Sequence, residues 1–548
     1  MHRDVESMSA KKYDLLIIGG GITGASVAWD AALRGLRVAL VDKGDFGAAT
    51  SAATSKLIHG GLRYLKTGEI GLVRESLQER RIMEIIAPHL VYPIPFIFPA
   101  YGWGMRGMPA VISAMVFYDT LSYDRRWIND DDKKIPGHIK YSEKEILEME
   151  PGLDSKDLKG GVIYNDCQMY NSERLTLEFN LSAAEYGADQ ANYTRVEDLI
   201  IEGDSVTGAR VRDLFSDKLY DINSRMTLNA AGPWADRMLG KLRGKVHHGL
   251  VRSKGIHLIT RPVHKEHSVV LQTRKGRHFF ILDWRGHSLI GTTDIVYKGD
   301  PDEFRVTESD VVDFLAEINE TFPSAKLERA DVLFQYGGLR PIVEKETSIE
   351  IEVYDASRKY EIYDHEQDEG ISGFLTAIGG KYTTSRNMAR QLVDLVYKKL
   401  DMPQVPCSTH TTPLFGGEVG RYVSFVDRAK KSNTAQLDEA VIENLCRNYG
   451  SRYQDVLKSS DNKKKYLEEV CEQFPDILAE VIYAVRKEMA VTLSDVVFRR
   501  TGIGTLGNPG TQVLERIVDV MAHELKWNRA KKNSEMETAL KNFETIKE

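Results

Sequence analysis

The sequence predicts an α/β fold that begins with a doubly wound, dinucleotide-binding sheet. Residues 13–18 (YDLLII) are a short apolar run rich in strand formers, and glycines follow at once. The alanine-rich stretch 25–33 is typical of a helix, and a second buried-type strand, 37–41 (RVALV), ends at Asp42. Strand, glycine-rich turn, helix and strand within about 30 residues form the βαβ unit that starts such a sheet.

Length and composition limit the number of domains and the classes of function that the chain can have. A chain of 548 residues is too long for one hydrophobic core, so we expect two or three domains. The 73 basic and 80 acidic residues give a net charge of −7, which argues against a dedicated nucleic-acid binder. Four widely spaced cysteines without a CxxC pair indicate a reducing compartment and predict neither a disulfide framework nor a metal site.

The rest of the chain shows both strand and helix patterns up to about residue 402 and mainly helical patterns after that. We expect strands at 206–213, 224–228, 288–290 and 374–377, and helices at 71–86, 172–186 and 387–399. The stretch 403–413 resembles a linker. The segment that follows consists mainly of charged, amphipathic helical patterns, which predicts a separate helical domain.

The segment 19–24 (GGGITG) is a GxGxxG motif in the right context, between a strand and a helix. Gly19 permits the tight turn, Gly21 lets the backbone approach a pyrophosphate, and Gly24 allows close packing of helix and strand. Asp42 is placed to accept hydrogen bonds from the adenosine ribose. The alternative is a glycine turn in an ordinary α/β protein, and the context favours dinucleotide binding.

The loop 47–64 (GAATSAATSKLIHGGLRY) favours FAD over NAD. It is small, hydroxylated and rich in glycine, and such a loop suits the pyrophosphate and ribityl chain of an extended FAD, where little side-chain volume fits. The alternative interpretation is a flexible surface loop.

Two segments carry a family resemblance: 55–65 (SKLIHGGLRYL) and 379–384 (GGKYTT) resemble the signature of aerobic-type FAD-dependent glycerol-3-phosphate dehydrogenases, which are related to D-amino-acid oxidase. Further similar segments follow in order from 13 to 500: 87–90 (APHL), 229–234 (NAAGPW), 254–257 (KGIH), 291–294 (GTTD), 338–341 (GLRP), 488–490 (EMA) and 495–500 (DVVFRR).

The resemblance implies a glutathione-reductase-type FAD-binding Rossmann domain, a β-sheet substrate domain and a C-terminal α-helical domain. The expected ranges are 1–90, 170–245 and 336–400 for the FAD-binding domain, 91–169 and 246–335 for the substrate-binding domain, and 401–548 for the helical domain.

The resemblance also implies FAD contacts. The segment 229–234 is then a second FAD-contacting turn, 379–383 lies beside the isoalloxazine, and the backbone of Val196 meets the adenine. The expected FAD contacts are Gly19, Gly21, Gly24, Asp42, Thr50, Ser51, Thr54, Ser55, His59, Gly60, Gly61, Val196, Ala231, Gly232, Trp234, Gly380, Lys381, Tyr382 and Thr383.

The implied substrate is glycerol 3-phosphate, a small dianion with two hydroxyls. Guanidinium groups match phosphate oxygens in a bidentate way that lysine does not. By resemblance, the substrate-binding residues are Arg63, Tyr64, Arg340, Arg358 and Lys381. Without the resemblance, each of the four charged residues would be interpreted as an ordinary surface or salt-bridging charge, although glycines or a proline constrain three of them.

The implied reaction is oxidation to dihydroxyacetone phosphate by hydride transfer from C2 to flavin N5 while the C2 hydroxyl loses its proton. We expect His257 to be the base and Arg340 to stabilise the developing alkoxide. A histidine in an apolar strand is often structural, so this role stays open. His59 is the competing histidine, and its loop favours a flavin contact.

The implied electron acceptor is a membrane quinone. The segment 101–127 is apolar and aromatic. Arg106 precedes its apolar helical part, and Arg125 and Arg126 follow it, as suits a helix lying in one leaflet. The alternative is a buried helix of the substrate domain.

No stretch reaches the roughly 18 apolar residues that a spanning helix needs. The first twelve residues lack an apolar signal region, so we expect a cytoplasmic enzyme attached peripherally to the inner face of the cell membrane.

Other functions remain open at this point. A related oxidase would use dioxygen, but it should carry a long insertion in the substrate domain that is not evident here. An amino-acid oxidase needs one arginine and an apolar slot, whereas the cationic cluster favours phosphate. A flavin-binding scaffold would not be reduced by substrate, and an NAD-dependent enzyme would carry no chromophore. A homodimer is one oligomeric state that the sequence leaves open.

Overall fold

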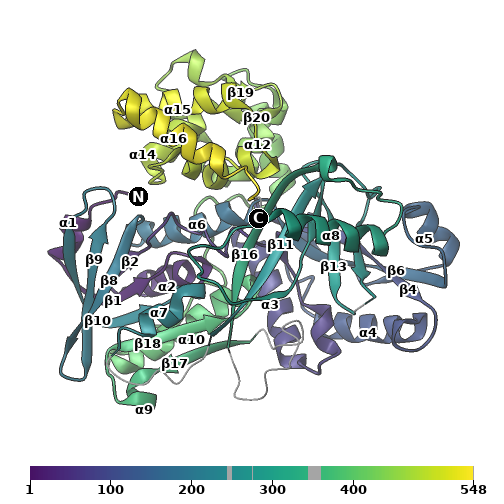
Figure 1. Ribbon diagram of the computed structural model, residues 1–548, viewed down its shortest axis with the longest axis horizontal. Coiled ribbons are helices and arrows are strands. Elements are labelled where there is room, and N and C mark those ends of the chain that lie inside the picture. Colours follow the sequence, from purple (N-terminus) through teal and green to yellow (C-terminus); the bar gives the residue numbers. More distant parts are fainter. Residues whose placement is uncertain (243–249, 275, 344–358, 547–548) are drawn as a thin grey trace.

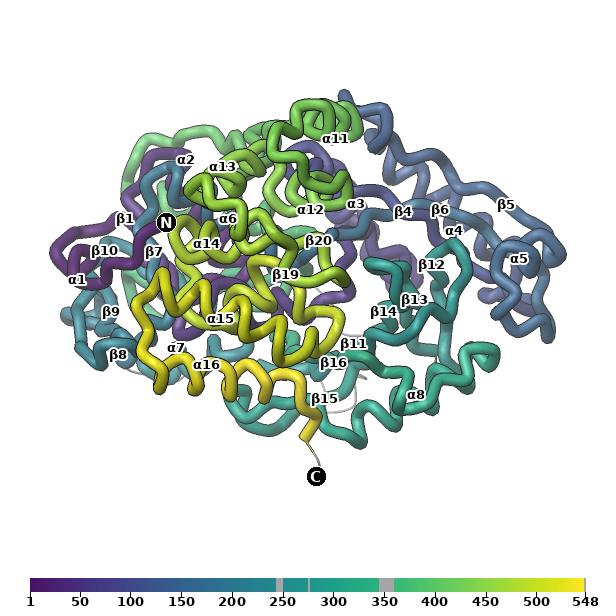
Figure 2. Tube along the Cα trace, turned by 90° about the horizontal axis from the view of Figure 1, so that it is seen from above, coloured from purple at the N-terminus to yellow at the C-terminus, as the bar shows by residue number. Residues whose placement is uncertain are grey.

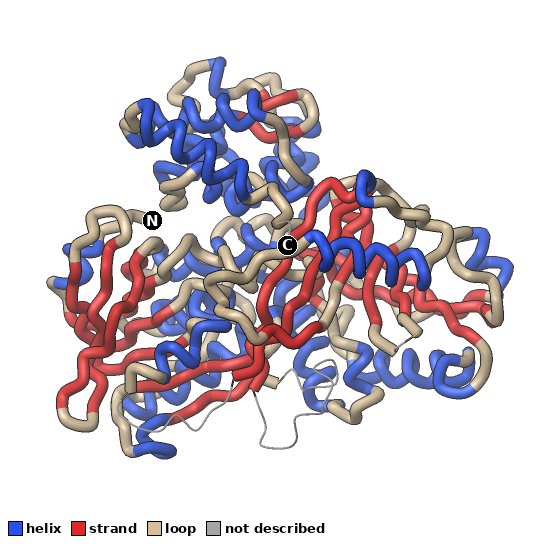
Figure 3. The backbone as a smooth tube through the Cα atoms, in the orientation of Figure 1, coloured by secondary structure: helices blue, strands red, loops and turns tan. Residues whose placement is uncertain are grey.

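The computed structural model describes residues 1–242, 250–274, 276–343 and 359–546. Two large sheets lie side by side, and a mostly helical C-terminal lobe lies above them (Figure 1). Figure 3 shows the same division by secondary structure, with helices predominating in the upper lobe and strands concentrated below. The α/β class is confirmed.

The first sheet contains the predicted dinucleotide-binding unit. Its main path, in spatial order, is β17 (Tyr360–Asp364), β18 (Phe374–Gly379), β10 (Leu219–Asn229), β1 (Lys12–Ile18), β2 (Val38–Val41) and β7 (Asp189–Ala191). From β18 to β7 these strands are parallel, whereas β17 pairs antiparallel with β18. The antiparallel hairpin β8 (Thr194–Glu202) and β9 (Ser205–Asp213) extends from β10.

Both faces of this sheet are covered, which explains the unbroken apolar run of β1. Leu15 and Ile17 join one buried cluster, and Leu16 and Ile18 join another on the opposite face. Helix α2 (Ile22–Leu33) connects β1 to β2, as predicted. It packs against α6 (Ser172–Glu185) and α10 (Ser385–Lys399), which come from distant parts of the chain.

The second sheet lies beside the first and forms the other half of the lower part of the molecule (Figure 1). Its strands are β3 (Leu57–Ile58), β4 (Val91–Tyr101), β5 (Ile139–Tyr141), β6 (Leu158–Met169), β11 (Leu250–Thr260), β12 (Ser268–Gln272), β13 (His278–Trp284), β14 (His287–Gly291), β15 (Ile295–Tyr297) and β16 (Val332–Val343). Strand β3 lies within the glycine-rich loop, so that loop joins the two sheets. The expected domain boundary at residue 336 falls inside β16, which pairs with β11 along its length.

Helices cover both faces of the second sheet: α5 (Glu143–Met149) and α8 (Glu308–Thr321) share one buried cluster with its strands, and α3 (Ile70–Ile86) and α4 (Met108–Leu121) share another. Three short helices complete the lower part: α1 (Val5–Ser9), α7 (Ala235–Leu239) and α9 (His365–Glu369). Among the described residues, no helix combines the length and apolar character needed to cross a bilayer.

The C-terminal lobe has its own core. Its helices are α11 (Tyr422–Lys431), α12 (Glu439–Tyr449), α13 (Tyr453–Lys458), α14 (Leu478–Lys487), a π-helical turn at Asp495–Arg500, α15 (Thr511–Leu525) and α16 (Arg529–Lys541). A small hairpin, β19 (Glu469–Cys471) and β20 (Phe474–Ile477), accompanies them. Seen from above, α14 and α15 lie over the middle of the molecule (Figure 2).

Candidate active site

A cavity of about 2430 Å³ lies between the two sheets, beyond the carboxyl end of β1. Most of the expected site residues line it: Gly19, Gly21, Asp42, Thr50, Ser51, Thr54, Ser55, His59, Gly61, Arg63, Tyr64, Val196, Ala231, Gly232, Trp234, His257, Arg340, Gly380, Lys381, Tyr382 and Thr383. Gly24 and Gly60 lie behind its wall. Arg358 is outside the described residues.

The glycine turn after β1 forms one end of the cavity. A Cβ at Gly24 would collide with the carbonyl oxygen of Gly19, and a Cβ at Gly19 would lie 2.6 Å from the carbonyl oxygen of Ala230. At Gly21 the only close atom is Ser51 Oγ, 3.2 Å away, so a side chain there would extend into the cavity. Ile22 N donates to the same Ser51 Oγ at 2.9 Å. The N-terminus of α2 thus faces a backbone-lined cradle that suits a pyrophosphate.

Asp42 ends β2 beside this cradle. Gly20 N donates to Asp42 Oδ2 at 2.6 Å, and Gly44 N donates to Asp42 Oδ1 at 2.8 Å. Burial raises the pKa of Asp42 to about 6, although these two backbone donors oppose the shift. Each carboxylate oxygen keeps a second lone pair, so Asp42 can accept further hydrogen bonds from a ribose.

The glycine-rich loop is held against β16. Thr50 Oγ1 donates to Leu339 O at 2.7 Å, and Tyr336 OH donates to Thr54 O at 2.8 Å. Lys56, which sequence reasoning did not single out within its motif, is fully buried and forms a 2.6 Å ion pair with Glu173 on α6. This lysine is therefore structural: it ties the loop to the first sheet's helices.

Strand pairing places His257 and Arg340 on one face of the second sheet. In the β11–β16 ladder His257 pairs with Tyr336, and Arg340 pairs with Ser253. Gly255 of β11 pairs with Gly338 of β16; His257 lies two residues after Gly255, and Arg340 lies two residues after Gly338. Because side chains two residues apart on a strand point to the same face, both project from one face of the sheet. The Arg340 guanidinium lies over Gly255, because a Cβ at that position would collide with Arg340 Nη2.

Three neighbours among the described residues hold Arg340. Its Nη2 donates to Thr292 Oγ1 at 3.0 Å and to Thr293 O at 2.8 Å, and its Nη1 lies 3.2 Å from Asp294 Oδ2. Asp294 also accepts a hydrogen bond from Ser253 Oγ and lines the cavity. Sequence reasoning quoted this GTTD segment but gave Asp294 no role, because its partner is 46 residues away in the chain.

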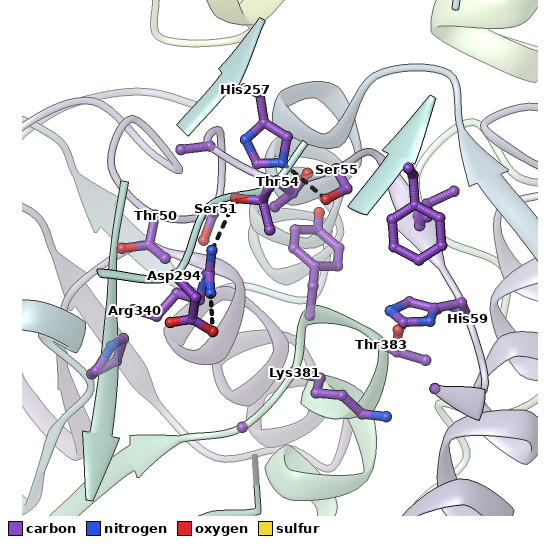
Figure 4. Close-up of a pocket in the computed structure, with 18 of the residues that line it drawn as sticks. Thr50, Ser51, Thr54, Ser55, His59, His257, Asp294, Arg340, Lys381 and Thr383 are labelled. Atoms are coloured by element: carbon purple, nitrogen blue, oxygen red, sulfur yellow. Dashed lines mark hydrogen bonds and ion pairs between the residues drawn. The ribbon is translucent and has the colours of Figure 1, made fainter. Parts of the chain in front are cut away.

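His257 is buried and neutral at pH 7. Burial lowers its pKa well below the usual value, and Arg340 and Lys56 lower it further. Its Nε2 lies 2.9 Å from Ser55 Oγ, and its ring stacks on Tyr336 with centroids 4.9 Å apart. These contacts fix the ring plane against the cavity wall (Figure 4).

A second cationic group lies beside Tyr64. Arg63 Nη2 donates to Tyr64 OH at 3.0 Å, and Lys381 Nζ lies 4.7 Å from the centre of the Tyr64 ring. Lys381 Nζ is buried without a hydrogen-bond partner among the described residues. Burial, and then Arg63, lower the pKa of Lys381 to about 7. An unsatisfied buried ammonium facing a cavity indicates an anionic ligand.

The remaining expected contacts surround this space. Figure 4 shows His59, Thr383 and Lys381 on one side of the site and Arg340 with Asp294 on the other. Burial, and then Lys381, lower the pKa of His59 to about 4, so its ring is neutral. Tyr382 directs its hydroxyl toward α6, where it donates to Ser172 O at 2.9 Å. Among the described residues no group of side chains suits a metal ion.

Comparison with known proteins agrees with this geometry. Residues 14–386 match the family model of FAD-dependent oxidoreductases, and residues 407–532 match the C-terminal domain of alpha-glycerophosphate oxidase. A glycerol-3-phosphate dehydrogenase of Synechocystis is 36% identical, covering 96% of this chain and 95% of the relative. The aerobic glycerol-3-phosphate dehydrogenase of Bacillus subtilis is 34% identical, covering 98% and 95%.

The chain belongs to the FAD-dependent glycerol-3-phosphate dehydrogenase family. The crystal structure of a Bacillus halodurans glycerol-3-phosphate dehydrogenase complexed with FAD superimposes with a TM-score of 0.78 at 30% identity, covering 98% of this chain and 95% of that one. The resemblance inferred from the sequence is therefore confirmed.

The cavity fits the cofactor of the FAD-dependent glycerol-3-phosphate dehydrogenase family. Gly19, Gly21 and the start of α2 provide the pyrophosphate cradle, and Asp42 lies where a ribose would follow. Lys381 and Arg340 line the same cavity, so these two cationic groups share one space with the glycine cradle.

Proposed function

We propose that this chain oxidises sn-glycerol 3-phosphate to dihydroxyacetone phosphate with FAD and passes the electrons to a membrane quinone. The observation that carries the proposal is the unsatisfied Lys381 ammonium, which shares one cavity with Arg340 and with the glycine cradle. A phosphate dianion would satisfy this ammonium, and the positive charge of the neighbouring Arg63 would add to its attraction.

The phosphate and the alcohol would occupy different parts of the site. Lys381 and Arg63 offer the charge for the phosphate, and Tyr64 holds the Arg63 guanidinium in place. Arg358, which lies outside the described residues, is proposed as a further phosphate ligand from the family resemblance. Arg340 would then face the C2 oxygen from the opposite side.

Proton removal is assigned to His257. Bound FAD supplies the two-electron acceptor for the hydride of C2. Since hydride loss turns the C2 hydroxyl into a strong acid, even a histidine of low pKa is basic enough to take its proton. Arg340 stabilises the oxygen as negative charge develops. The neutral state of His257 at pH 7 supports this role.

The exposed apolar surface around α4 supports the membrane and quinone parts of the proposal. Trp103 is 84% exposed, Met105 is 78% exposed, and Val116 and Phe117 protrude from α4. Arg106 and Arg126 flank this surface and are also exposed. Aromatic side chains beside arginines suit the headgroup region of one leaflet, at the inner face of the cell membrane. The alternative of a buried helix holds for only one face of α4, where Val111, Met115 and Tyr118 are buried.

The same surface is continuous with the cavity. Trp103, Met105 and Phe117 line the cavity that also contains His59 and Lys381. A lipid-soluble quinone can therefore enter from the membrane side without crossing bulk water. Dioxygen, the acceptor of an oxidase, would need no such apolar approach.

Anaerobic addition of glycerol 3-phosphate to the yellow holoenzyme tests the proposal. We expect the flavin absorbance to bleach and to return rapidly with a soluble ubiquinone or menaquinone analogue but slowly with air. Faster return with air than with quinone would indicate an oxidase. Bleaching by an amino acid instead would indicate the amino-acid oxidase alternative, and no bleaching would contradict an enzymatic role.

A further inference from the structure

We infer that the C-terminal helical domain retains FAD by clamping the loop that follows β2. The clamp consists of Arg499 and Arg500, from the π-helical turn, and Asp45, which lies three residues after Asp42. Loss of the clamp should release the adenosine end of the cofactor.

The clamp consists of two largely buried ion pairs between distant parts of the chain. Arg499 Nε lies 2.5 Å from Asp45 Oδ2, Arg500 Nη1 also contacts this oxygen, and Arg500 Nη2 lies 3.0 Å from Asp45 Oδ1. Asp45 and Arg500 are fully buried. The guanidinium of Arg500 additionally donates to Glu488 O at 2.8 Å, which anchors it within the C-terminal domain.

A neighbouring segment, residues 192–193, strengthens the attachment. Asn192 Nδ2 donates to Asp45 Oδ1 at 3.0 Å and to Met489 O of the C-terminal domain at 3.1 Å. Tyr193 N donates to Gly44 O at 2.9 Å, and Tyr193 OH donates to Asp495 Oδ1 at 2.5 Å. The loop after β2 is therefore bonded to the C-terminal domain both directly and through one intermediate segment.

Three of the residues that join the loop to the C-terminal domain line the cavity. Asp45, Tyr193 and Arg499 line the same cavity as Asp42 and Val196, the two positions expected at the ribose and adenine. Gly44, whose backbone N holds Asp42 Oδ1, is adjacent to Asp45 in the chain. Movement of Asp45 would therefore displace the carboxylate that faces the ribose.

The two arginines keep the buried Asp45 carboxylate charged. Burial alone would raise the pKa of Asp45, but Arg500 and Arg499 lower it below its usual range. Removing Asp45 deprives the buried Arg500 of its carboxylate, and removing either arginine weakens the compensation of the Asp45 charge, so each change destabilises the docked arrangement. Because coupling between two sites is reciprocal, FAD binding should in turn stabilise the docked C-terminal domain.

The test compares FAD dissociation rates of purified holoenzymes, followed by the recovery of free-flavin fluorescence after dilution. We expect Asp45→Asn, Arg499→Gln and Arg500→Gln each to accelerate FAD release about tenfold. Arg499 is the less buried arginine, with a side chain 12% exposed, so Arg499→Gln and the isosteric Asp45→Asn provide the measurement if Arg500→Gln does not fold.

The matched control is Arg174→Gln. Arg174 on α6 forms an equally buried 2.5 Å ion pair with Glu488 across the same interface, but it does not line the cavity. We expect it to lower the melting temperature without accelerating FAD release. The inference is overturned if FAD leaves the clamp variants at the wild-type rate, or if Arg174→Gln releases FAD as fast as they do.

A second readout does not depend on cofactor loss. In the wild-type chain, adding FAD to the apoprotein should slow amide hydrogen exchange across 489–500, and this protection should be absent in Asp45→Asn. Equal protection in both proteins would show that the C-terminal domain does not sense the cofactor through Asp45.

Discussion

Arg340 Nη1 lies 3.2 Å from Asp294 Oδ2, so the cavity contains an arginine whose orientation is fixed before any substrate binds. The Asp294 side chain is only 3% exposed, and it accepts a further hydrogen bond from Ser253. Donors that need no rearrangement stabilise developing charge most effectively. The pair therefore serves two purposes, because it holds the guanidinium and offsets the cost of burying it.

Replacing Arg340 should lower catalysis without preventing folding. We expect Arg340→Ala to lower kcat/KM about 10²- to 10³-fold, or roughly 3 to 4 kcal/mol, as for removal of a preorganised donor. The assay uses a soluble dye as acceptor. Arg261→Ala, which removes an exposed arginine paired with Asp331 near the end of β11, is the control. A change of less than twofold for Arg340→Ala would remove it from the site.

Asp294 should act only through Arg340. We expect Asp294→Asn to lower kcat about tenfold, since the guanidinium loses its charged partner while the local shape is kept. In an Arg340→Ala background the same substitution should have little further effect, because coupled residues are not additive. Full additivity in this double-mutant cycle would show that Asp294 acts independently.

The pH dependence of kcat/KM should report Lys381. Because its pKa is lowered to about 7, the ammonium is present below that pH and is lost as the pH rises through it. The substrate phosphate, with a second pKa of about 6, becomes a monoanion in acid. We therefore expect kcat/KM to peak between these values and KM to rise in alkali.

Lys381→Arg separates this explanation from others. A guanidinium stays protonated throughout the accessible range, so the alkaline fall of kcat/KM should disappear in this variant even if its maximum is lower. An unchanged alkaline limb would mean that another group titrates there.

Membrane attachment should depend on the exposed face of α4. We expect Val116→Asp to weaken sedimentation with vesicles containing anionic lipid, because a charge would enter the interfacial layer, while activity with the soluble dye is retained. Val312→Asp on α8 is the matched control, since Val312 is 50% exposed and Val116 is 52% exposed. Equal vesicle binding by both variants would place the membrane surface elsewhere.

Sequence-local features were predictable because their physical causes are local. The apolar run 13–18, the glycines at 19, 21 and 24, and Asp42 lie within 30 residues of one another, and they determine a βαβ unit with a cofactor cradle. The periodic helices, such as α3 and α10, were predicted to within a few residues for the same reason. The family signature indicated which distant motifs should share one site.

Only the tertiary structure decided how these motifs meet. The β11–β16 register brings His257 and Arg340 to one face, and the pairing of Arg340 with Asp294 crosses 46 residues of chain. Burial, which no motif encodes, leaves the Lys381 ammonium without a partner among the described residues.

The sequence by itself determined the fold class, the cofactor cradle and the family, because side-chain period and backbone clearance depend on near neighbours. The tertiary structure decided which charges are paired, which remain available to an anion, and that the C-terminal domain reaches Asp45 at the cavity. Charge pairing and desolvation depend on groups from distant segments, and only the folded chain brings those groups together.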